Sequence, residues 1–314
     1  MTEDGTDAAA VRDLFDTRTG IAGRYAVARD PAAGLLATRP APDPAEMAAL
    51  HAAYRPFAAA EGTAYRRVRE GVFNSPLYRL WLAVDGDPSF HGASFEGRVV
   101  DLGCGDGRLL DRLARAGVAA EGIEQVPASV RAARARGLTV HEAPLEDFAP
   151  TEPFDSAVAA NVLEHCADPA AALAAARRIL RQGGALRVSC PNAGGLYARL
   201  FGRAWINWHV PYHLWHFTAG DLDRSLRDAG FSDIAIRTET PALWLAQSIV
   251  VWLRARPGRP TRALRNLLVM APLTLLLRLL LFPVLWLVDR AGRGDCLIAT
   301  ARRAPSARVP PLAR

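Results

Sequence analysis

Three glycines at alternate positions follow a short apolar run that ends in an acidic residue. In the stretch GRVVDLGCGDGRLLDRLARAG, Asp101 stands two residues ahead of Gly103, and Gly105 and Gly107 follow. Glycines at this spacing let a ligand approach the backbone closely, and the helix that follows turns its first amide groups toward the same place. The stretch therefore predicts a strand, a tight loop and a helix that together bind a cofactor or co-substrate.

A second carboxylate stands at the end of the next apolar run, VAAEGIEQV. Glu124 lies about twenty residues past the loop, where an acid in doubly wound folds hydrogen-bonds the hydroxyls of a ribose. A dinucleotide-binding loop would need its third glycine at the position of Arg108. A nicotinamide-dependent dehydrogenase is therefore disfavoured, although a nucleoside ligand fits.

Further elements follow in the order that a doubly wound sheet requires. A helical pattern closes at Gly137, and residues 138–148, 153–169 and 183–192 read as the third, fourth and fifth strands with their loops. Residues 231–240 read as the sixth strand, after a helix that begins with a capping box of Thr218 and Asp221.

This ordered set resembles the class I S-adenosylmethionine-dependent methyltransferases over residues 95–241 and 295–303. The resemblance implies S-adenosylmethionine as donor. It places the donor against Asp101, Gly103, Cys104, Gly105, Glu124 and Gln125, with Glu146 and Asp147 near the adenine and the stretch from Asn161 to Glu164 beside the methionine part. For Glu146 and Asp147, the alternative is that both are merely solvated ends of a loop.

The fold class expected from this resemblance is α/β, with a Rossmann-like sheet of seven strands. A seventh strand, Asp295–Arg303, should return antiparallel beside the fifth after a hydrophobic helical insertion at 242–294. The domain organisation expected is a disordered start at 1–20, an N-terminal helical lid at 21–94, the methyltransferase domain at 95–303 and a flexible basic tail at 304–314.

Two histidines are the candidate catalytic bases. His165 follows the fourth strand directly, and His213 lies in the aromatic segment NWHVPYHLWHFT. Methyl transfer requires donor and acceptor to be held in line, and an oxygen or nitrogen acceptor can lose its proton to a histidine near neutral pH. The alternative for His165 is that it only orients its loop.

No metal is expected. His209, His213 and His216 are clustered, but no carboxylate stands nearby at ligand spacing. Residues 24–50 resemble the zinc-knuckle preface of some bacterial methyltransferases, with Asp30 and Ala33 at the two cysteine positions. The four cysteines show no paired spacing, which favours a reduced compartment.

The segment Leu267–Val288 is apolar enough to suggest a membrane span. Pro272 and Pro283, with Arg278 between them, should cut it into a piece of about ten residues, which is too short to cross a bilayer. Aromatic residues and five arginines precede it, so residues 243–290 are expected to form a helical hairpin that lies on an anionic membrane surface. The alternative is that the hairpin is buried against the lid or in an oligomer.

Composition limits the remaining classes. All 38 basic residues are arginine, which indicates the coding bias of a GC-rich bacterium, and no nucleic-acid-binding motif accompanies the net charge of +6. The acidic start lacks a leader pattern, so the location expected is the cytoplasm, peripheral on the cytoplasmic face of the membrane. The function expected is methyl transfer to an oxygen or nitrogen of a small-molecule or lipid-linked, apolar acceptor. The alternative is a non-catalytic scaffold that recruits partners to the membrane.

Overall fold

A seven-stranded sheet organises the chain. The computed structural model describes residues 11–53, 71 and 75–305. The strand order is β10-β11-β8-β7-β4-β5-β6, and β11 runs in the opposite direction to the other six strands of this sheet. The strands are β4 (Val99–Leu102), β5 (Ala120–Glu124), β6 (Val140–Glu142), β7 (Phe154–Ala160), β8 (Leu180–Pro191), β10 (Phe231–Glu239) and β11 (Cys296–Arg303). This confirms the expected fold class.

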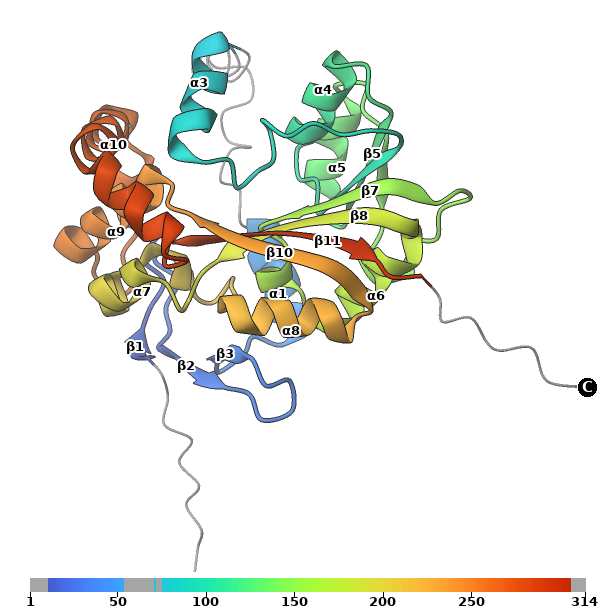
Figure 1. The fold of residues 1–314 in the computed structure, drawn as a ribbon. Coiled ribbons are helices and arrows are strands. Elements are labelled where there is room, and N and C mark those ends of the chain that lie inside the picture. The colour runs from blue at the N-terminus through green and yellow to red at the C-terminus, as the bar shows by residue number, and fades with distance from the viewer. Residues whose placement is uncertain (1–10, 54–70, 72–74, 306–314) are drawn as a thin grey trace, which may run out of the picture.

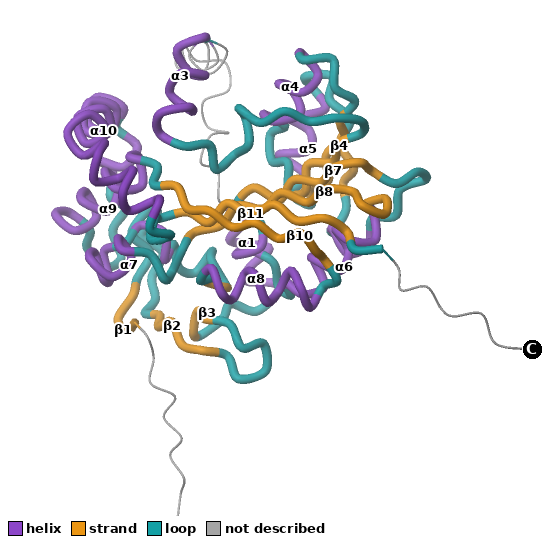
Figure 2. The backbone as a smooth tube through the Cα atoms, in the orientation of Figure 1, coloured by secondary structure: helices purple, strands orange, loops and turns teal. Residues whose placement is uncertain are grey.

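Helices cover both faces of this sheet (Figures 1 and 2). α4 (Arg108–Arg115) and α5 (Pro127–Arg134) lie on one face, and α6 (Pro169–Ile179) and α8 (Ala219–Asp228) lie on the other. All four residues of β4 are buried, as expected for a central parallel strand. The capping box of Thr218 and Asp221 is present at the start of α8 and confirms that part of the sequence analysis.

The N-terminal part forms a second, smaller sheet. The strands β1 (Val11–Leu14), β2 (Tyr25–Arg29) and β3 (Leu36–Arg39) pair in order, and β9 (Trp215–His216) adds to the edge of β3. The expectation of disorder is therefore wrong for residues 11–20, and residues 1–10 lie outside the described part. The segment 21–94 is not purely helical either, because it contains β2 and β3, and β3 pairs with β9 in the aromatic segment.

Helices do occur later in this segment. α1 (Pro44–Ala53) and α3 (Pro76–Asp85) are described, whereas the helices expected over residues 54–70 and 72–74 fall outside the described residues. The basic tail expected at 304–314 lies outside them from residue 306 onward. Asp30 occupies the turn between β2 and β3, where its carboxylate accepts hydrogen bonds from the amides of Ala32 and Ala33.

The insertion between β10 and β11 is a helical hairpin. α9 (Ala242–Arg254) and α10 (Leu267–Arg290) pack against each other at one end of the main sheet (Figure 1). The expectation that Pro272 and Pro283 cut the apolar segment is wrong, because α10 is one continuous helix about 36 Å long. Each proline removes one backbone hydrogen bond from the helix, and the helix nevertheless continues through both positions.

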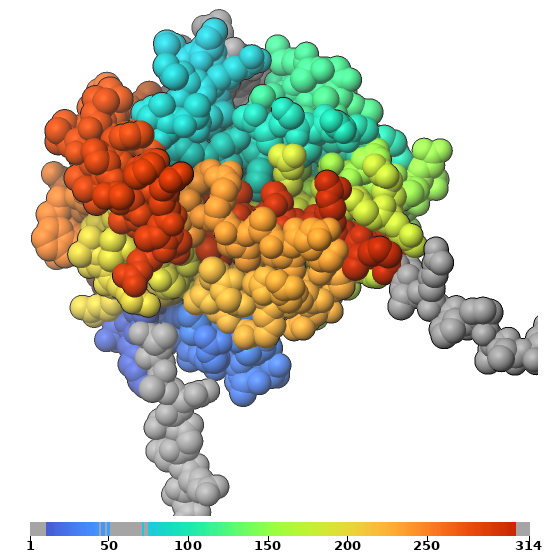
Figure 3. All heavy atoms as spheres, in the orientation of Figure 1, coloured from blue at the N-terminus to red at the C-terminus, as the bar shows by residue number. Residues whose placement is uncertain are grey.

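One stripe of α10 carries this packing. Met270, Thr274, Arg278 and Leu285 are buried against the protein at helical spacing. The Arg278 side chain approaches Asp85 at the end of α3, with 3.7 Å between Nε and Oδ1. The rest of the helix surface is apolar and open, and Figure 3 shows α10 in orange-red along one edge of the molecule.

The remaining helices are short and connect these units. They are α7 (Leu196–Phe201) and the 3-10 turns η2 (Leu145–Asp147), η3 (Leu163–His165), η4 (Gly202–Ala204), η5 (Ile206–Trp208) and η6 (Arg262–Arg265).

Candidate active site

The glycine loop sits between the ends of β4 and β5. The amides of Gly103 and Cys104 both donate to the carbonyl of Ile123, and the amide of Gly107 donates to the carbonyl of Cys104. These three amides therefore stabilise the loop itself. The amides expected to face a ligand are those that begin α4 at Arg108, and their contact with a ligand stays a prediction.

Gly105 is the glycine that opens onto free space. Its φ is +54°, and a Cβ built there would have no heavy atom within 4 Å. A Cβ on Gly103 would instead lie 2.9 Å from the Val162 side chain. Gly103 is therefore needed for packing, whereas a side chain at Gly105 would project into the space where a ligand could approach the loop.

Glu124 fixes the loop against the next strand. Its Oε2 accepts from the amide of Gly105 at 2.9 Å, and its Oε1 accepts from the amide of Val126 at 2.7 Å. A carboxylate has about four acceptor sites, so two remain in principle for hydroxyl groups. The structure thus gives Glu124 a positioning role that the sequence analysis did not foresee.

Asp101 lies beneath the same loop. Burial, and then the nearby Glu124 carboxylate, raise the pKa of Asp101 to about 8. The Cys104 sulfur packs in a buried cluster with Leu110 and Val130, so the Cys104 side chain belongs to the core between sheet and helices. Gln125, directly after β5, is exposed.

The other residues expected at the donor lie at the same edge of the sheet. Glu146 and Asp147 are exposed in η2, after β6, and Asn161 follows β7 with a φ of +54°. The Asn161 amide donates to the carbonyl of Ser189 at 2.9 Å. The carboxyl ends of parallel strands meet at one edge, and ligands of open α/β sheets bind there. The structure brings all these residues to that edge, and their contact with the donor stays a prediction.

His165 and His213 lie together with Glu164, which was expected beside the methionine part and not in a group with these histidines. Glu164, His165 and His213 each offer a ligand atom, and these atoms lie within 4.8 Å of one another. The two imidazole rings meet edge to face with 4.6 Å between centroids. The signal was hidden because η3 and the aromatic segment come together only in the folded chain.

Backbone carbonyls orient both imidazoles. His165 Nδ1 lies 3.0 Å from the carbonyl oxygen of Tyr212, and His213 Nδ1 lies 2.8 Å from that of Asn207. A carbonyl only accepts, so Nδ1 carries the proton and Nε2 carries the lone pair in the neutral ring. Burial keeps the pKa of His213 well below its usual value, which makes the neutral ring dominant at pH 7.

Glu164 is buried without compensation. It is 1 % exposed, and neither carboxyl oxygen has a hydrogen-bond partner in the described part of the chain. Burial raises the pKa of Glu164 to about 8, so the carboxyl group keeps its proton at neutral pH. Glutamate with two histidines is nevertheless a donor set that suits a zinc or iron ion once the carboxyl group is deprotonated.

The other two histidines of the aromatic segment have different surroundings. His216 Nε2 lies 2.9 Å from Thr38 Oγ1 on β3, so this histidine on β9 connects two neighbouring strands of the smaller sheet. His209 stacks on Tyr212 with 4.9 Å between ring centroids. The three histidines stay close in the fold, with ring centroids 4.8 Å apart for His209 and His213 and 6.4 Å apart for His213 and His216. Of the three, His213 is the one that offers a ligand atom together with Glu164 and His165.

The Glu164→Gln variant should change how stability depends on pH. The folded chain keeps the Glu164 proton up to about pH 8, whereas the unfolded chain loses it near 4.5. The free energy of unfolding of the wild type should therefore fall as pH rises between these values, by up to about 1.4 kcal/mol per pH unit from this group. The variant lacks this contribution, so its melting temperature relative to wild type should rise from pH 5 to pH 8.

Thermal melts across this range measure the effect, and exposed Glu142→Gln on β6 is the control. If the melting temperatures of wild type and Glu164→Gln change with pH in the same way, the assignment of a buried carboxyl group that retains its proton is contradicted.

The expectation that the protein holds no metal stays a prediction, and the cluster shows how to test it. Metal ligands must be deprotonated, whereas Glu164 retains its proton at neutral pH. Elemental analysis of the dialysed full-length chain should find far less than one metal ion per chain. An ion that wild type retains and Glu164→Gln loses would instead make the cluster a metal site.

Comparisons with known proteins agree with the fold. A family model described as a methyltransferase domain matches residues 65–236, which is more than half of the chain. A ubiquinone biosynthesis O-methyltransferase of Cereibacter sphaeroides is 33% identical over 154 residues, or 45% of this chain and 62% of the relative. The ubiquinone biosynthesis O-methyltransferase of Xylella fastidiosa is 38% identical over 103 residues, which are 30% of this chain and 42% of the relative. The chain thus matches less than two thirds of the length of these relatives.

Solved structures are more distant. A S-adenosylmethionine-dependent methyltransferase of Thermotoga maritima is 19% identical, with a TM-score of 0.47 over 76% of this chain and 96% of that one. Phosphoethanolamine N-methyltransferase 2 of Haemonchus contortus is 16% identical, with a TM-score of 0.47; the match covers 75% of this chain and 56% of that one. The family match includes the glycine loop, Glu124 and the group of Glu164, His165 and His213. It ends before α9, the first helix of the hairpin. The chain belongs to the methyltransferase-domain family.

Proposed function

We propose that this enzyme methylates an oxygen or nitrogen of an apolar, lipid-linked acceptor that it meets at a membrane surface. The observation that carries the proposal is the hairpin of α9 and α10, which exposes a continuous apolar surface beside a run of arginines. The names of the ubiquinone biosynthesis relatives support an oxygen acceptor on an apolar molecule.

The donor would lie across the carboxyl edge of β4 and β5. S-adenosylmethionine supplies an activated methyl group on its sulfonium. The open space at Gly105 suits a close approach of the donor to the loop, and Glu124 has acceptor capacity left for ribose hydroxyls. Glu146 and Asp147 would lie near the adenine, and Asn161 near the methionine part.

His165 and His213 are the proposed proton acceptors for the methylated group. In each histidine the Nδ1 N–H donates a hydrogen bond to a backbone carbonyl. Nε2 is then left to take up a proton from the molecule that is methylated. The low pKa of His213 makes it available in the neutral form but a weaker base than free imidazole. Positioning of donor and acceptor therefore supplies the larger share of the rate.

The hairpin is suited to the surface of a bilayer. Its exposed large apolar residues are Leu243, Trp252, Leu253, Leu267, Leu268, Val269, Leu275, Leu276, Leu279, Leu280, Phe282, Val284, Trp286 and Leu287. Burial of apolar surface stabilises by about 25 cal/mol per Å². The five arginines between Arg254 and Arg265 stand without an acidic residue among them, and each contributes about 1 kcal/mol near anionic lipid.

Sheet pairing favours a hairpin that lies on the membrane. α10 is long and apolar enough to cross a bilayer. However, Glu239 at the end of β10 pairs with Cys296 at the start of β11, so both ends of the insertion return to one sheet. α9 spans only about 20 Å, which is too short for a second crossing, and Arg278 faces the protein.

Gly105→Leu should abolish binding of S-adenosylmethionine and leave the fold intact. The new side chain would fill the open space at the loop, at the cost of a left-handed backbone conformation of about 1 kcal/mol. Gly117→Leu is the matched control, because Gly117 also has a positive φ and open space but lies beyond the far end of α4. Equilibrium dialysis with labelled donor measures binding, and equal binding by both variants would refute the site.

Replacing the outer face of α10 should release the protein from membranes. Leu276→Gln, Leu279→Gln and Leu280→Gln remove exposed apolar side chains and leave the buried stripe unchanged. Deletion of the hairpin is a poorer test, because Leu245 and Leu285 belong to a buried cluster. The full-length chain should float with liposomes, more strongly when anionic lipid is present, and the triple variant should not.

Three exposed leucines outside the hairpin provide the control, as Leu77→Gln, Leu80→Gln and Leu200→Gln. This control should float like wild type. If wild type stays unbound as a tight dimer and the α10 variant becomes monomeric, residues 243–290 are an oligomer interface and the membrane proposal fails.

A further inference from the structure

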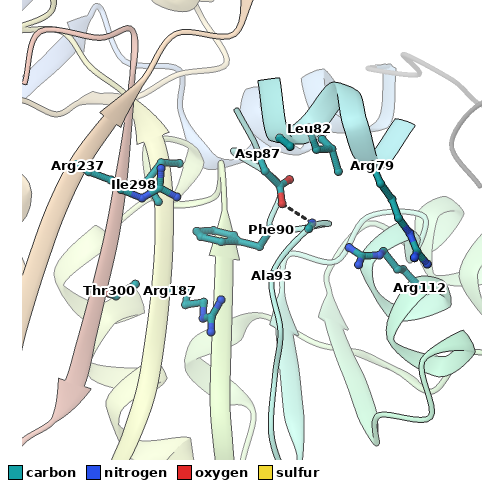
Figure 4. A pocket seen from close by; sticks show the side chains of 12 residues that line it. Arg79, Leu82, Asp87, Phe90, Ala93, Arg112, Arg187, Arg237, Ile298 and Thr300 are labelled. Carbon is teal, nitrogen blue, oxygen red and sulfur yellow. Dashed lines mark hydrogen bonds between the residues drawn. The ribbon is translucent and has the colours of Figure 1, made fainter. Parts of the chain in front are cut away.

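A cavity of about 600 Å³ lies between α3, α4 and the sheet. Figure 4 shows Arg79 and Arg112 pointing toward each other on one side, Arg187 and Arg237 on the opposite side, and Phe90 between them. The four arginines come from α3, α4, β8 and β10, so the fold gathers them from distant parts of the chain. The volume is within the ordinary range for ligand pockets.

The charges of Arg79 and Arg112 are not neutralised. In the described part of the chain, neither guanidinium group has a carboxylate within ion-pair distance or a hydrogen-bond acceptor. The pKa of Arg112 is lowered by burial, opposed by the charge of Asp87, and lowered further by the nearby charge of Arg79. Two guanidinium groups thus repel each other across the cavity wall, which an anion between them would relieve.

The opposite wall adds positive charge. Arg187 on β8 stacks over the Phe95 ring at 4.4 Å and donates to the carbonyl of Ser94. Arg237 on β10 is already held by Glu239. Among the described residues that line the cavity, four are arginines and one, Asp87, carries a carboxylate.

Asp87 is itself occupied. Its oxygens accept hydrogen bonds from the amides of His91 and Gly92, and burial raises its pKa. It therefore leaves an excess of positive charge in the cavity. A neutral ligand would leave that repulsion in place.

We propose that this cavity binds a phosphate group, either of a free phosphate or of a phospholipid-type headgroup. The planar guanidinium group donates two parallel hydrogen bonds, a geometry that matches phosphate oxygens. The site goes beyond the proposed methyl transfer and does not depend on it.

The cavity adjoins the donor loop. Tyr78 on α3 lies 3.1 Å from Nδ1 of His91, the neighbour of the cavity-lining residue Gly92. Arg112, which also lines the cavity, lies one turn along α4 from the residue that follows the glycine loop. A phosphate-bearing molecule held by Arg79 and Arg112 would therefore lie beside the loop that is expected to hold the donor.

Calorimetry on the full-length chain tests the site with two probes, inorganic diphosphate and a water-soluble short-chain phosphatidic acid. The test variant carries Arg79→Gln and Arg112→Gln together. Arg115→Gln is the matched control, because Arg115 is an exposed arginine on the same helix and pairs with Asp111. Wild type and the control should bind at least one probe, and the double variant should bind it at least about tenfold more weakly.

Binding of diphosphate would identify the phosphate group itself as the ligand chemistry, and binding of phosphatidic acid alone would identify a lipid headgroup. The proposal is overturned if wild type binds neither probe, or if the double variant binds as wild type does. S-adenosylhomocysteine titrated into the same samples should bind all three proteins equally, which separates failure of this site from failure of the donor site.

Discussion

The pairing of β11 on both of its edges is the constraint on which the rest of the architecture depends. β11 is hydrogen-bonded to β8 along one side and to β10 along the other. Because β11 comes after α10 in the chain, the whole insertion must leave and re-enter the sheet at one place. The hairpin is thereby confined to one end of the sheet, and it leaves the strand order around the carboxyl edge of β4 and β5 uninterrupted.

The hairpin is also joined to the lid side of the molecule. Asp85 at the end of α3 accepts from the amide of Ala242 at the start of α9 and approaches Arg278 on α10. Burial raises the pKa of Asp85 to about 7. The same helix, α3, carries Arg79 into the cavity beside the donor loop. The surface proposed to bind a membrane and the helix that lines the cavity thus share one buried polar contact.

Sequence reasoning succeeded where the signal is local and failed where it depends on distant contacts. The glycine loop and Glu124 were predictable because they lie in a local strand-loop-helix-strand order. The return of β11 was predictable only from the resemblance to methyltransferases. The pairing of β3 with β9 and the meeting of Glu164 with His213 join segments far apart in the chain. The continuity of α10 through Pro272 and Pro283 was missed because its packing stripe is visible only in the fold.

The central claim is that the edge formed by the glycine loop and Glu124 binds S-adenosylmethionine. Isothermal titration of the full-length chain with S-adenosylhomocysteine, and separately with NADH, tests it most directly. Saturable binding of one S-adenosylhomocysteine per chain, with no heat from NADH, is the result expected. Saturable binding of NADH, or no binding of S-adenosylhomocysteine by folded protein, would contradict it.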